Sequence, residues 1–259
     1  MSVPLLEVRR LSMDFSGFSA LSDVSLSIEA GSTTAIVGPN GAGKTTLLNC
    51  VCGMYRPRSG DVLLRGESIL RLRPSDIARR GVARTFQNVE HARSLTAAEL
   101  TMLGCHESET ATFIELALRL PRARRDEHAH RALALEIMRE LRIVDVADHK
   151  LETLPYAMRK SADLARALAA RPKLLLLDEP SAGMASVEKD LLRRSLRQLR
   201  GTWYETLVIV DHDIAFLQAI CDSTVVLDFG KKIAEGSTAA VLSDPHVVEA
   251  YLGVPLESG

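Results

Sequence analysis

Near its N-terminal end the chain contains the stretch Gly38-Pro39-Asn40-Gly41-Ala42-Gly43-Lys44-Thr45, which matches the pattern Gly-x-x-x-x-Gly-Lys-Ser/Thr in full. The apolar run Thr34–Val37 before it predicts a strand, and Thr45–Val51 predicts a helix. Glycines let the backbone wrap closely around phosphates, and successive amides at a helix N-terminus supply positive potential. The order of strand, glycine-rich loop and helix therefore predicts a nucleotide-binding loop. In such a loop Lys44 reaches the β- and γ-phosphates, and the Thr45 hydroxyl ligates Mg²⁺.

Two carboxylates follow an apolar run further along the chain. Leu174–Leu177 is typical of a parallel strand that is buried on both faces, and Asp178 and Glu179 come directly after it. Open α/β sheets bind their ligands at the carboxyl ends of such strands. We therefore expect Asp178 to hold Mg²⁺ and Glu179 to orient or deprotonate an attacking water.

Three further side chains are candidates for the same site. His212 follows a second apolar run, Leu207–Val210, and can contact the γ-phosphate and hold the attacking water, although a lone loop histidine is more often structural. Gln87 lies where the first strands give way to a helical pattern, and it can meet both Mg²⁺ and the water. Phe15, beside Gly17, can stack on a base, with an ordinary core position as the alternative.

The periodicity of the sequence changes twice along the chain. Leu6–Arg9 and Val24–Ile28 alternate apolar and polar residues, as half-buried antiparallel strands do. From about Ala97 to Ala170 the period is helical, and the strand pattern returns after Pro172. One helical face is formed by Leu133, Ile137, Met138 and Leu141. We expect one α/β domain over residues 1–259, with a nucleotide-binding core at 1–87 and 171–259 and a helical subdomain at 88–170.

Composition excludes several classes of protein. In 259 residues, 32 Lys and Arg against 33 Asp and Glu give a net charge of −1, which does not fit a dedicated nucleic-acid binder. No window reaches the roughly 18 apolar residues of a membrane span, and Met1–Glu7 is not the start of a signal peptide. The cysteines lack the spacing of a zinc site or disulfide framework, so we expect buried or half-buried thiols at Cys50, Cys52, Cys105 and Cys221.

Taken in order, these motifs resemble those of ABC-transporter ATPases over essentially the whole chain. The resemblance implies a P-loop NTPase (RecA-like) core with an N-terminal antiparallel β layer and an inserted α-helical subdomain. It also implies ATP and Mg²⁺ as ligands. The implied nucleotide-binding residues are Phe15, Gly38, Pro39, Asn40, Gly41, Ala42, Gly43, Lys44, Thr45, Thr46 and Gln87. The implied catalytic residues are Glu179 and His212, and the implied Mg²⁺ ligands are Thr45, Gln87 and Asp178.

The resemblance is closer to one branch, the ATP-binding subunits of branched-chain amino acid importers (LivG-like), a pattern that importers of urea and short amides share. It rests on the stretches at residues 38–46, 78–88, 178–184, 229–236 and 248–253. This branch implies a second ABC ATPase subunit, integral-membrane permease subunits and, indirectly, an extracytoplasmic binding protein as partners, with no nucleic acid. It further implies a cytoplasmic protein held on the inner face of the cell membrane by the permeases.

The sequence departs from this family at the signature motif, which normally reads LSGGQ or, in this branch, LSYGQ. Here the aligned residues are Leu154-Pro155-Tyr156-Ala157-Met158, and Ala185 stands where an Asp or Asn is usual. The resemblance implies that Pro155, Tyr156, Ala157 and Met158 act on the nucleotide held by a partner chain. Proline has neither a hydroxyl nor an N–H to offer a phosphate, so we expect a heterodimer with unequal sites.

Two alternatives remain open at this point. The degenerate signature suggests a nucleotide-binding regulatory subunit with little turnover of its own, although Glu179 and His212 argue against it. A soluble ABC protein that acts on ribosomes or DNA is the other alternative. Such proteins usually carry two cassettes or a long coiled-coil insertion, and this chain has one cassette and no basic arm.

Overall fold

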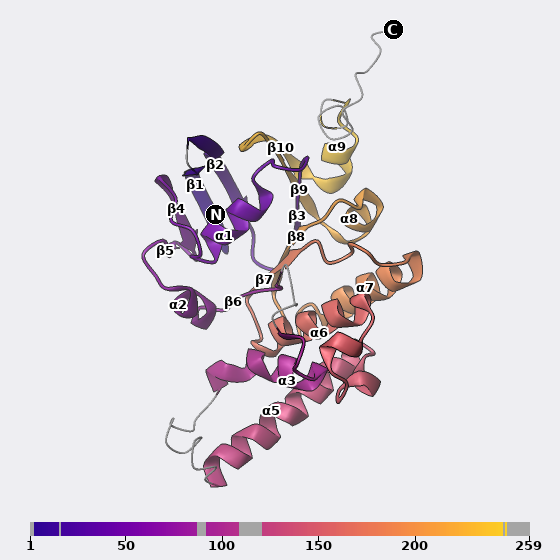
Figure 1. The fold of residues 1–259 in the computed structure, drawn as a ribbon. Coiled ribbons are helices and arrows are strands. Elements are labelled where there is room, and N and C mark those ends of the chain that lie inside the picture. The colour runs from indigo at the N-terminus through magenta and orange to yellow at the C-terminus, as the bar shows by residue number, and fades with distance from the viewer. Residues whose placement is uncertain (1–2, 16, 87–91, 109–120, 246, 248–259) are drawn as a thin grey trace. The chain divides into compact units, whose positions relative to one another are not determined.

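The computed structural model describes residues 3–15, 17–86, 92–108, 121–245 and 247 (Figure 1). The chain divides into two compact units. The first unit comprises Met1–Val82, Lys173–Ala182 and Glu205–Gly259. The second comprises Ala83–Pro172 and Gly183–Tyr204.

The first unit contains an antiparallel sheet built from the N-terminal strands. Its strands are β1 (Leu6–Phe15), β2 (Phe18–Ile28), β4 (Ser59–Leu64) and β5 (Glu67–Ser68), in the order β2-β1-β4-β5. Alternation places Leu6 and Val8 in the core, and a register shift after Val8 brings Leu11 there as well, each no more than 3% exposed. The predicted antiparallel layer is confirmed.

A six-stranded sheet of order β10-β9-β3-β8-β7-β6 provides the nucleotide-binding core. Its strands are β3 (Thr33–Val37), β6 (Val82–Arg84), β7 (Leu174–Asp178), β8 (Thr206–Val210), β9 (Ser223–Asp228) and β10 (Lys231–Ser237). Strand β3 runs parallel to β8 and β9, and β7 runs parallel to β8. Every residue of β3, β7 and β8 is buried, as the unbroken apolar runs predict.

The helices of the first unit are short. They are α1 (Lys44–Val51), α2 (Pro74–Arg79), α8 (Ile214–Ile220) and α9 (Thr238–Leu242). Leu47 and Leu48 of α1 are each 1% exposed and join one hydrophobic core cluster with Leu11, Leu21 and Leu174. Helix α1 is therefore held by burial of its apolar face, which fixes the loop that precedes it.

The second unit is helical. Its elements are α3 (Ala97–Met102), η2 (Leu103–Ser108), α5 (Pro121–Glu140), η3 (Val144–Val146), η4 (Leu151–Thr153), α6 (Tyr156–Ala169) and α7 (Ser186–Leu199). Helix α3 begins with a full capping box between Thr96 and Glu99. On the predicted helical face, Ile137 and Met138 are fully buried and Leu141 is 5% exposed. The predicted change from strands to helices is confirmed.

The two units do not follow the predicted division at residues 88–170, because α7 groups with the helical unit. After α7, the Tyr204 hydroxyl donates to the Leu196 carbonyl over 2.6 Å, and Trp203 and Tyr204 are each 4% exposed. The Arg171 guanidinium lies 4.6 Å from the centre of the Trp203 ring. These contacts depend on which helices pack together, and sequence order does not reveal that.

The cysteines behave as predicted. Cys50, Cys105 and Cys221 are buried, Cys52 is half-buried, and all four carry thiols that are not joined in disulfides. Burial raises the pKa of Cys50 to about 11. Burial, together with the charges of Asp222 and Asp211, raises the pKa of Cys221 to about 12. Both thiols are therefore protonated at neutral pH and poor nucleophiles. Among the described parts of the chain, every helix is too short or too polar to cross a bilayer.

Candidate active site

Three neighbouring parallel strands bring the predicted residues to one edge of the sheet. The phosphate loop follows β3, His212 follows β8 and Glu179 follows β7. Val210 at the end of β8 pairs with Ile36 on one side and with Asp178 on the other. The adjacent order of β3, β8 and β7 thus confirms that the three motifs meet at the carboxyl ends of their strands.

The phosphate loop needs glycine at two positions. At Gly38 the backbone φ is 152°, and a Cβ there would lie 2.0 Å from the Leu227 carbonyl oxygen. At Gly43, which caps α1 with a φ of 98°, a Cβ would lie 2.5 Å from the Ala20 carbonyl oxygen. Neither site admits a side chain, because the loop passes close to the neighbouring backbone at both positions. The backbone amides of the loop lie at the start of α1.

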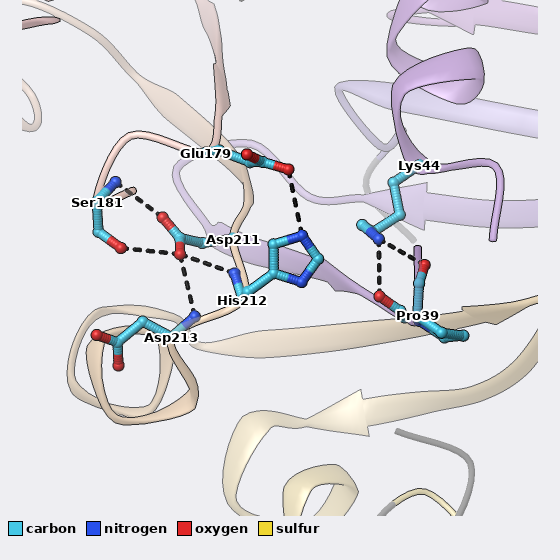
Figure 2. A network of polar contacts seen from close by, with 8 residues as sticks. Pro39, Lys44, Glu179, Ser181, Asp211, His212 and Asp213 are labelled. Carbon is cyan, nitrogen blue, oxygen red and sulfur yellow. Dashed lines mark hydrogen bonds and ion pairs between the residues drawn. The ribbon is translucent and has the colours of Figure 1, made fainter. Parts of the chain in front are cut away.

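Lys44 is the charged group of this loop. It is only 6% exposed, and its Nζ donates to the carbonyl oxygens of Gly38 over 2.7 Å and Pro39 over 2.8 Å (Figure 2). Burial lowers the pKa of Lys44, while the charges of Glu179 and Asp178 oppose that shift. The Lys44 ammonium is therefore held within the loop and interacts electrostatically with the carboxylates of Glu179 and Asp178.

Glu179 and His212 are in direct contact. Glu179 Oε1 lies 3.2 Å from His212 Nε2, and both side chains are about two-fifths exposed, at 44% and 41% (Figure 2). Glu179 has a φ of +50°, and its backbone N–H donates to the Val210 carbonyl over 2.7 Å. A carboxylate and an imidazole that are both open to solvent can together accept and orient a water molecule.

Sequence reasoning missed two residues beside this pair, Asp211 and Ser181. Asp211 is 2% exposed and Ser181 is 1% exposed, and the Ser181 hydroxyl and backbone N–H both donate to the Asp211 carboxylate. The only signal in the sequence is that each stands close to a predicted catalytic residue at a strand end. Their pairing depends on the strand order, which periodicity does not give.

The predicted Mg²⁺ ligands that are described fit the ion chemically. Asp178 ends β7 and is 6% exposed, and Thr45 is half-buried in the first turn of α1. Carboxylate and hydroxyl oxygens are the ligand types that Mg²⁺ prefers. The charge of Asp178 also acts on Lys44 and opposes the lowering of the Lys44 pKa by burial. Gln87, the third predicted ligand, lies outside the described residues.

Phe15 stands at the end of β1 and remains 39% exposed. Its ring contacts Tyr55 edge to face, with ring centres 5.2 Å apart and planes at 75°. Tyr55, which sequence reasoning did not single out, follows the phosphate-loop helix and is itself 37% exposed. The aromatic pair is compatible with base stacking on Phe15.

In the helical unit, the departures from the signature motif lie at the start of α6. Pro155 is the N-cap and makes no side-chain capping bond, and the first bond of the helix runs from Arg159 N–H to the Pro155 carbonyl over 3.1 Å. Tyr156 and Met158 are 48% and 37% exposed. These residues therefore lie at a helix N-terminus.

Ala185 has a similar local effect at α7. Its backbone N–H donates to Glu188 Oε2 over 2.7 Å, which is one half of a capping box. The reciprocal half needs a side-chain oxygen at the N-cap, and alanine has none. The helix therefore begins with one bond fewer than an Asp or Asn at this position would supply.

The sequence matches two protein families. Residues 21–182 match the family described as ABC transporter, and residues 231–256 match the family described as branched-chain amino acid ATP-binding cassette transporter. Together these matches include the phosphate loop, Asp178, Glu179 and the C-terminal hairpin strand β10.

The chain is similar over nearly its full length to curated transport proteins. It is 36% identical to the high-affinity branched-chain amino acid transport ATP-binding protein BraF of Pseudomonas aeruginosa, over 98% of this chain and 99% of that protein. It is 33% identical to LivG of Escherichia coli, with the same coverage. Among solved structures, a nucleotide-free ATP-binding cassette from an ABC transporter is 29% identical, with a TM-score of 0.84 and coverage of 97% and 100%.

Proposed function

This chain belongs to the ABC transporter family, as an ATP-binding subunit of the branched-chain amino acid transporter type, and we propose that it hydrolyses ATP to power the import of branched-chain amino acids or similar small amino acids and amides. The observation that carries the proposal is the contact between Glu179 and His212, which follow β7 and β8 at the sheet edge where the phosphate loop follows β3. The substrate class rests on the names of the relatives, BraF and LivG.

ATP enters with its phosphates on the loop of residues 38–46 and its base on Phe15. The phosphate oxygens accept hydrogen bonds from Lys44 Nζ in place of the Gly38 and Pro39 carbonyl oxygens. Thr45, Asp178 and Gln87 would hold Mg²⁺, which would supply positive charge to the phosphates.

Glu179 and His212 activate and position the attacking water. The oxygen of the water bonds to the γ-phosphorus while Glu179 accepts a proton from that water. His212 holds the water and the γ-phosphate in place. The bond between the γ-phosphorus and the bridging oxygen breaks, and ADP departs with that electron pair, leaving inorganic phosphate. Because both side chains are about two-fifths exposed, water and phosphate can reach them.

Two such cassettes close head to tail on ATP, and each site combines the phosphate loop of one chain with the signature helix of the other. Closure moves the permease subunits, which hold the chain on the cytoplasmic face of the membrane, and an extracytoplasmic binding protein delivers the cargo. Support comes from family membership and from the exposed start of α6, where the amides of residues 156–158 have no side-chain cap.

Pro155 and Ala157 favour a partner that is not a second copy of this chain. Proline offers a phosphate no donor, and Ala157 adds a Cβ where close backbone approach is needed. The weakened site lies on the partner, whereas the site built on Lys44, Glu179 and His212 receives the partner's signature. A heterodimer keeps one good site, while a homodimer has none.

A regulatory subunit with little turnover is the second candidate, favoured by the same uncapped helix start at Pro155. The Glu179 and His212 contact weighs against it, since a chain without turnover has no need of a paired carboxylate and imidazole.

The experiment is a transport ATPase assay in proteoliposomes. The chain is co-expressed with candidate permease subunits and a second cassette, and binding protein is added with or without leucine, isoleucine or valine. We expect loaded binding protein to stimulate ATP hydrolysis and amino acid uptake. Stimulation by urea or acetamide but by none of the amino acids would restrict the cargo to amides and contradict the branched-chain amino acid assignment. The absence of hydrolysis under every condition would favour the regulatory subunit.

A further inference from the structure

The carboxylate of Asp211 is buried and accepts four hydrogen bonds, which Figure 2 shows as a fan around its two oxygens. Oδ2 accepts from the Ser181 backbone N–H over 2.9 Å, and Oδ1 accepts from the Ser181 hydroxyl over 2.8 Å. Oδ1 also accepts from the backbone N–H groups of His212 over 2.7 Å and Asp213 over 3.0 Å. A buried carboxylate is stable only when it is satisfied in this way.

These donors come from two different loops. Ser181 follows β7 and stands two residues after Glu179, while His212 and Asp213 follow β8. Between Glu179 and Ser181 the chain turns back, because the Ala182 N–H donates to the Glu179 carbonyl over 3.3 Å. The carboxylate of Asp211 therefore joins the loop that carries Glu179 to the loop that carries His212.

Strand pairing alone does not fix the two side chains. The last backbone bond between the strands runs from Glu179 N–H to the Val210 carbonyl, and both loops continue beyond it. Glu179 also has a positive φ, a conformation that persists only where its surroundings enforce it. Past Val210, two hydrogen bonds from Ser181 to the Asp211 carboxylate join the two loops, in addition to the Glu179 and His212 contact itself.

We infer that Asp211 is a positioning residue that sets the distance between Glu179 and His212 and so prepares the pair for the attacking water. The inference rests on the proposed catalytic roles of Glu179 and His212. Asp211 itself is buried and acts through Ser181 and through its own neighbours in the chain. Charged hydrogen bonds are the strong ones, which suits a carboxylate at this position.

Asp211→Asn is the sharpest variant, since it keeps the size of the side chain and removes one acceptor. With its amide nitrogen at the Oδ2 position, it faces the Ser181 N–H and loses that bond. With the nitrogen at the Oδ1 position, it faces the N–H groups of His212 and Asp213. The first orientation weakens the link between the two loops, and the second disturbs the turn that carries His212.

Ser181→Ala is the second variant, because it removes only the hydroxyl bond and stays testable if Asp211→Asn does not fold. Asp213→Asn is the matched control. It makes the same change of carboxylate to amide two residues away, where the side chain caps α8 by accepting from the Phe216 N–H over 2.9 Å, and asparagine caps equally well.

Two readouts are taken on the full chain, with Glu179→Gln as a reference. The first is MgATP hydrolysis in the assembled transporter, analysed as kcat and KM. The second is the nitrogen NMR signals of the His212 ring in histidine-labelled protein, identified by their loss in His212→Gln. The ring signals report the contact with Glu179 without any need for turnover.

We expect Asp211→Asn to lower kcat by about 10- to 100-fold with KM within about twofold, the scale of a small misplacement of reacting groups. Ser181→Ala should lower kcat by a smaller factor, and both variants should move the His212 ring signals toward those of Glu179→Gln. Asp213→Asn should match the wild type in both readouts.

The inference is overturned if Glu179→Gln changes hydrolysis and ring signals while Asp211→Asn and Ser181→Ala change neither. It is also overturned if Asp211→Asn raises KM and leaves kcat unchanged. Normal hydrolysis by Glu179→Gln would instead contradict the proposed function on which the inference rests. Failure of the inference and failure of the proposed function are therefore distinguishable.

Discussion

Glu179 Oε1 and His212 Nε2 are 3.2 Å apart, although the two residues are separated by 33 positions in the sequence. The contact exists because β7 and β8 are adjacent parallel strands that end at the same level, with Asp178 paired to Val210. The proposed catalytic pair depends on each of its two members.

His212→Ala should therefore keep ATP binding and lower hydrolysis by about 100-fold or more, the scale of a lost group in general acid–base catalysis. His149→Ala is the control, since His149 is exposed and belongs to the helical unit. Equal hydrolysis by His212→Ala and His149→Ala would show that His212 has no role in turnover. The measurement is phosphate release at saturating MgATP.

Lys44 gives a prediction about pH. Because burial lowers its pKa below the ordinary lysine value of 10.5, the ammonium loses its proton at a lower pH than an exposed lysine does. A triphosphate binds the charged form, so ATP affinity should weaken as pH rises through that lowered pKa. Equilibrium titrations with ATP between about pH 8 and pH 10.5 measure it.

Lys44→Ala is the matched variant for this titration. It should bind ATP weakly at every pH and show no alkaline decline, whereas Lys150→Ala, which alters an exposed lysine, should behave like the wild type. An affinity that stays constant up to pH 10.5 in the wild type would contradict the assignment of Lys44 to the phosphates.

Much of this site could be predicted from the sequence because the information is local. The glycine pattern before Lys44 and the buried run before Asp178 each specify a strand end and its chemistry within a few residues. The link between Asp211 and Ser181 could not be predicted in the same way. It requires β8 to lie beside β7, and strand order is decided by the packing of the whole sheet.

The same reasoning explains what was missed elsewhere. Phe15 was singled out, but its edge-to-face contact with Tyr55 joins β1 to the segment after α1, and no periodic pattern relates the two. The predicted core at residues 171–259 includes the residues of α7, whereas the contacts of α7 group it with the other helices. Residues that meet through tertiary packing leave no mark on local periodicity.

Pro155 and Ala157 predict unequal sites. The double change Pro155→Ser with Ala157→Gly should raise ATP turnover of the chain on its own, because it restores donors to the signature helix. A charged hydrogen bond of roughly 1.5–3 kcal/mol corresponds to about 10- to 150-fold in affinity for the closed state. The assay compares both proteins alone and with the second cassette.

Tyr156→Phe tests the rival explanation, that the exposed Tyr156 hydroxyl compensates for the proline. If the unaltered chain hydrolyses ATP rapidly by itself and the double change has no effect, the sites are not unequal. A loss of that activity in Tyr156→Phe would then assign the missing donor to the tyrosine.

Removal of the Asp163 carboxylate should have a large effect on the free energy of unfolding. Its buried carboxylate accepts from Arg166 Nε over 2.7 Å and from the Phe86 N–H over 2.6 Å. The Arg166 side chain, 13% exposed, also donates to the Arg84 carbonyl. Asp163→Ala leaves the guanidinium without its carboxylate, so it should lower the free energy of unfolding by about 3–5 kcal/mol.

Urea denaturation followed by circular dichroism measures this effect, with Asp145→Ala as the control at an exposed aspartate. Similar denaturation curves for the two variants would show that the buried pair contributes little to the stability of the helical unit.

The most direct test of the account is MgATP binding and hydrolysis by Glu179→Gln, measured on the same preparation in the assembled transporter. Because ATP binding rests on Lys44 and the loop amides, the variant should bind MgATP with an affinity within about twofold of the wild type. Its turnover should fall by at least about 100-fold, since the carboxylate that accepts the proton from water is lost. Unchanged binding together with unchanged hydrolysis would contradict the central claim that Glu179 is the catalytic base.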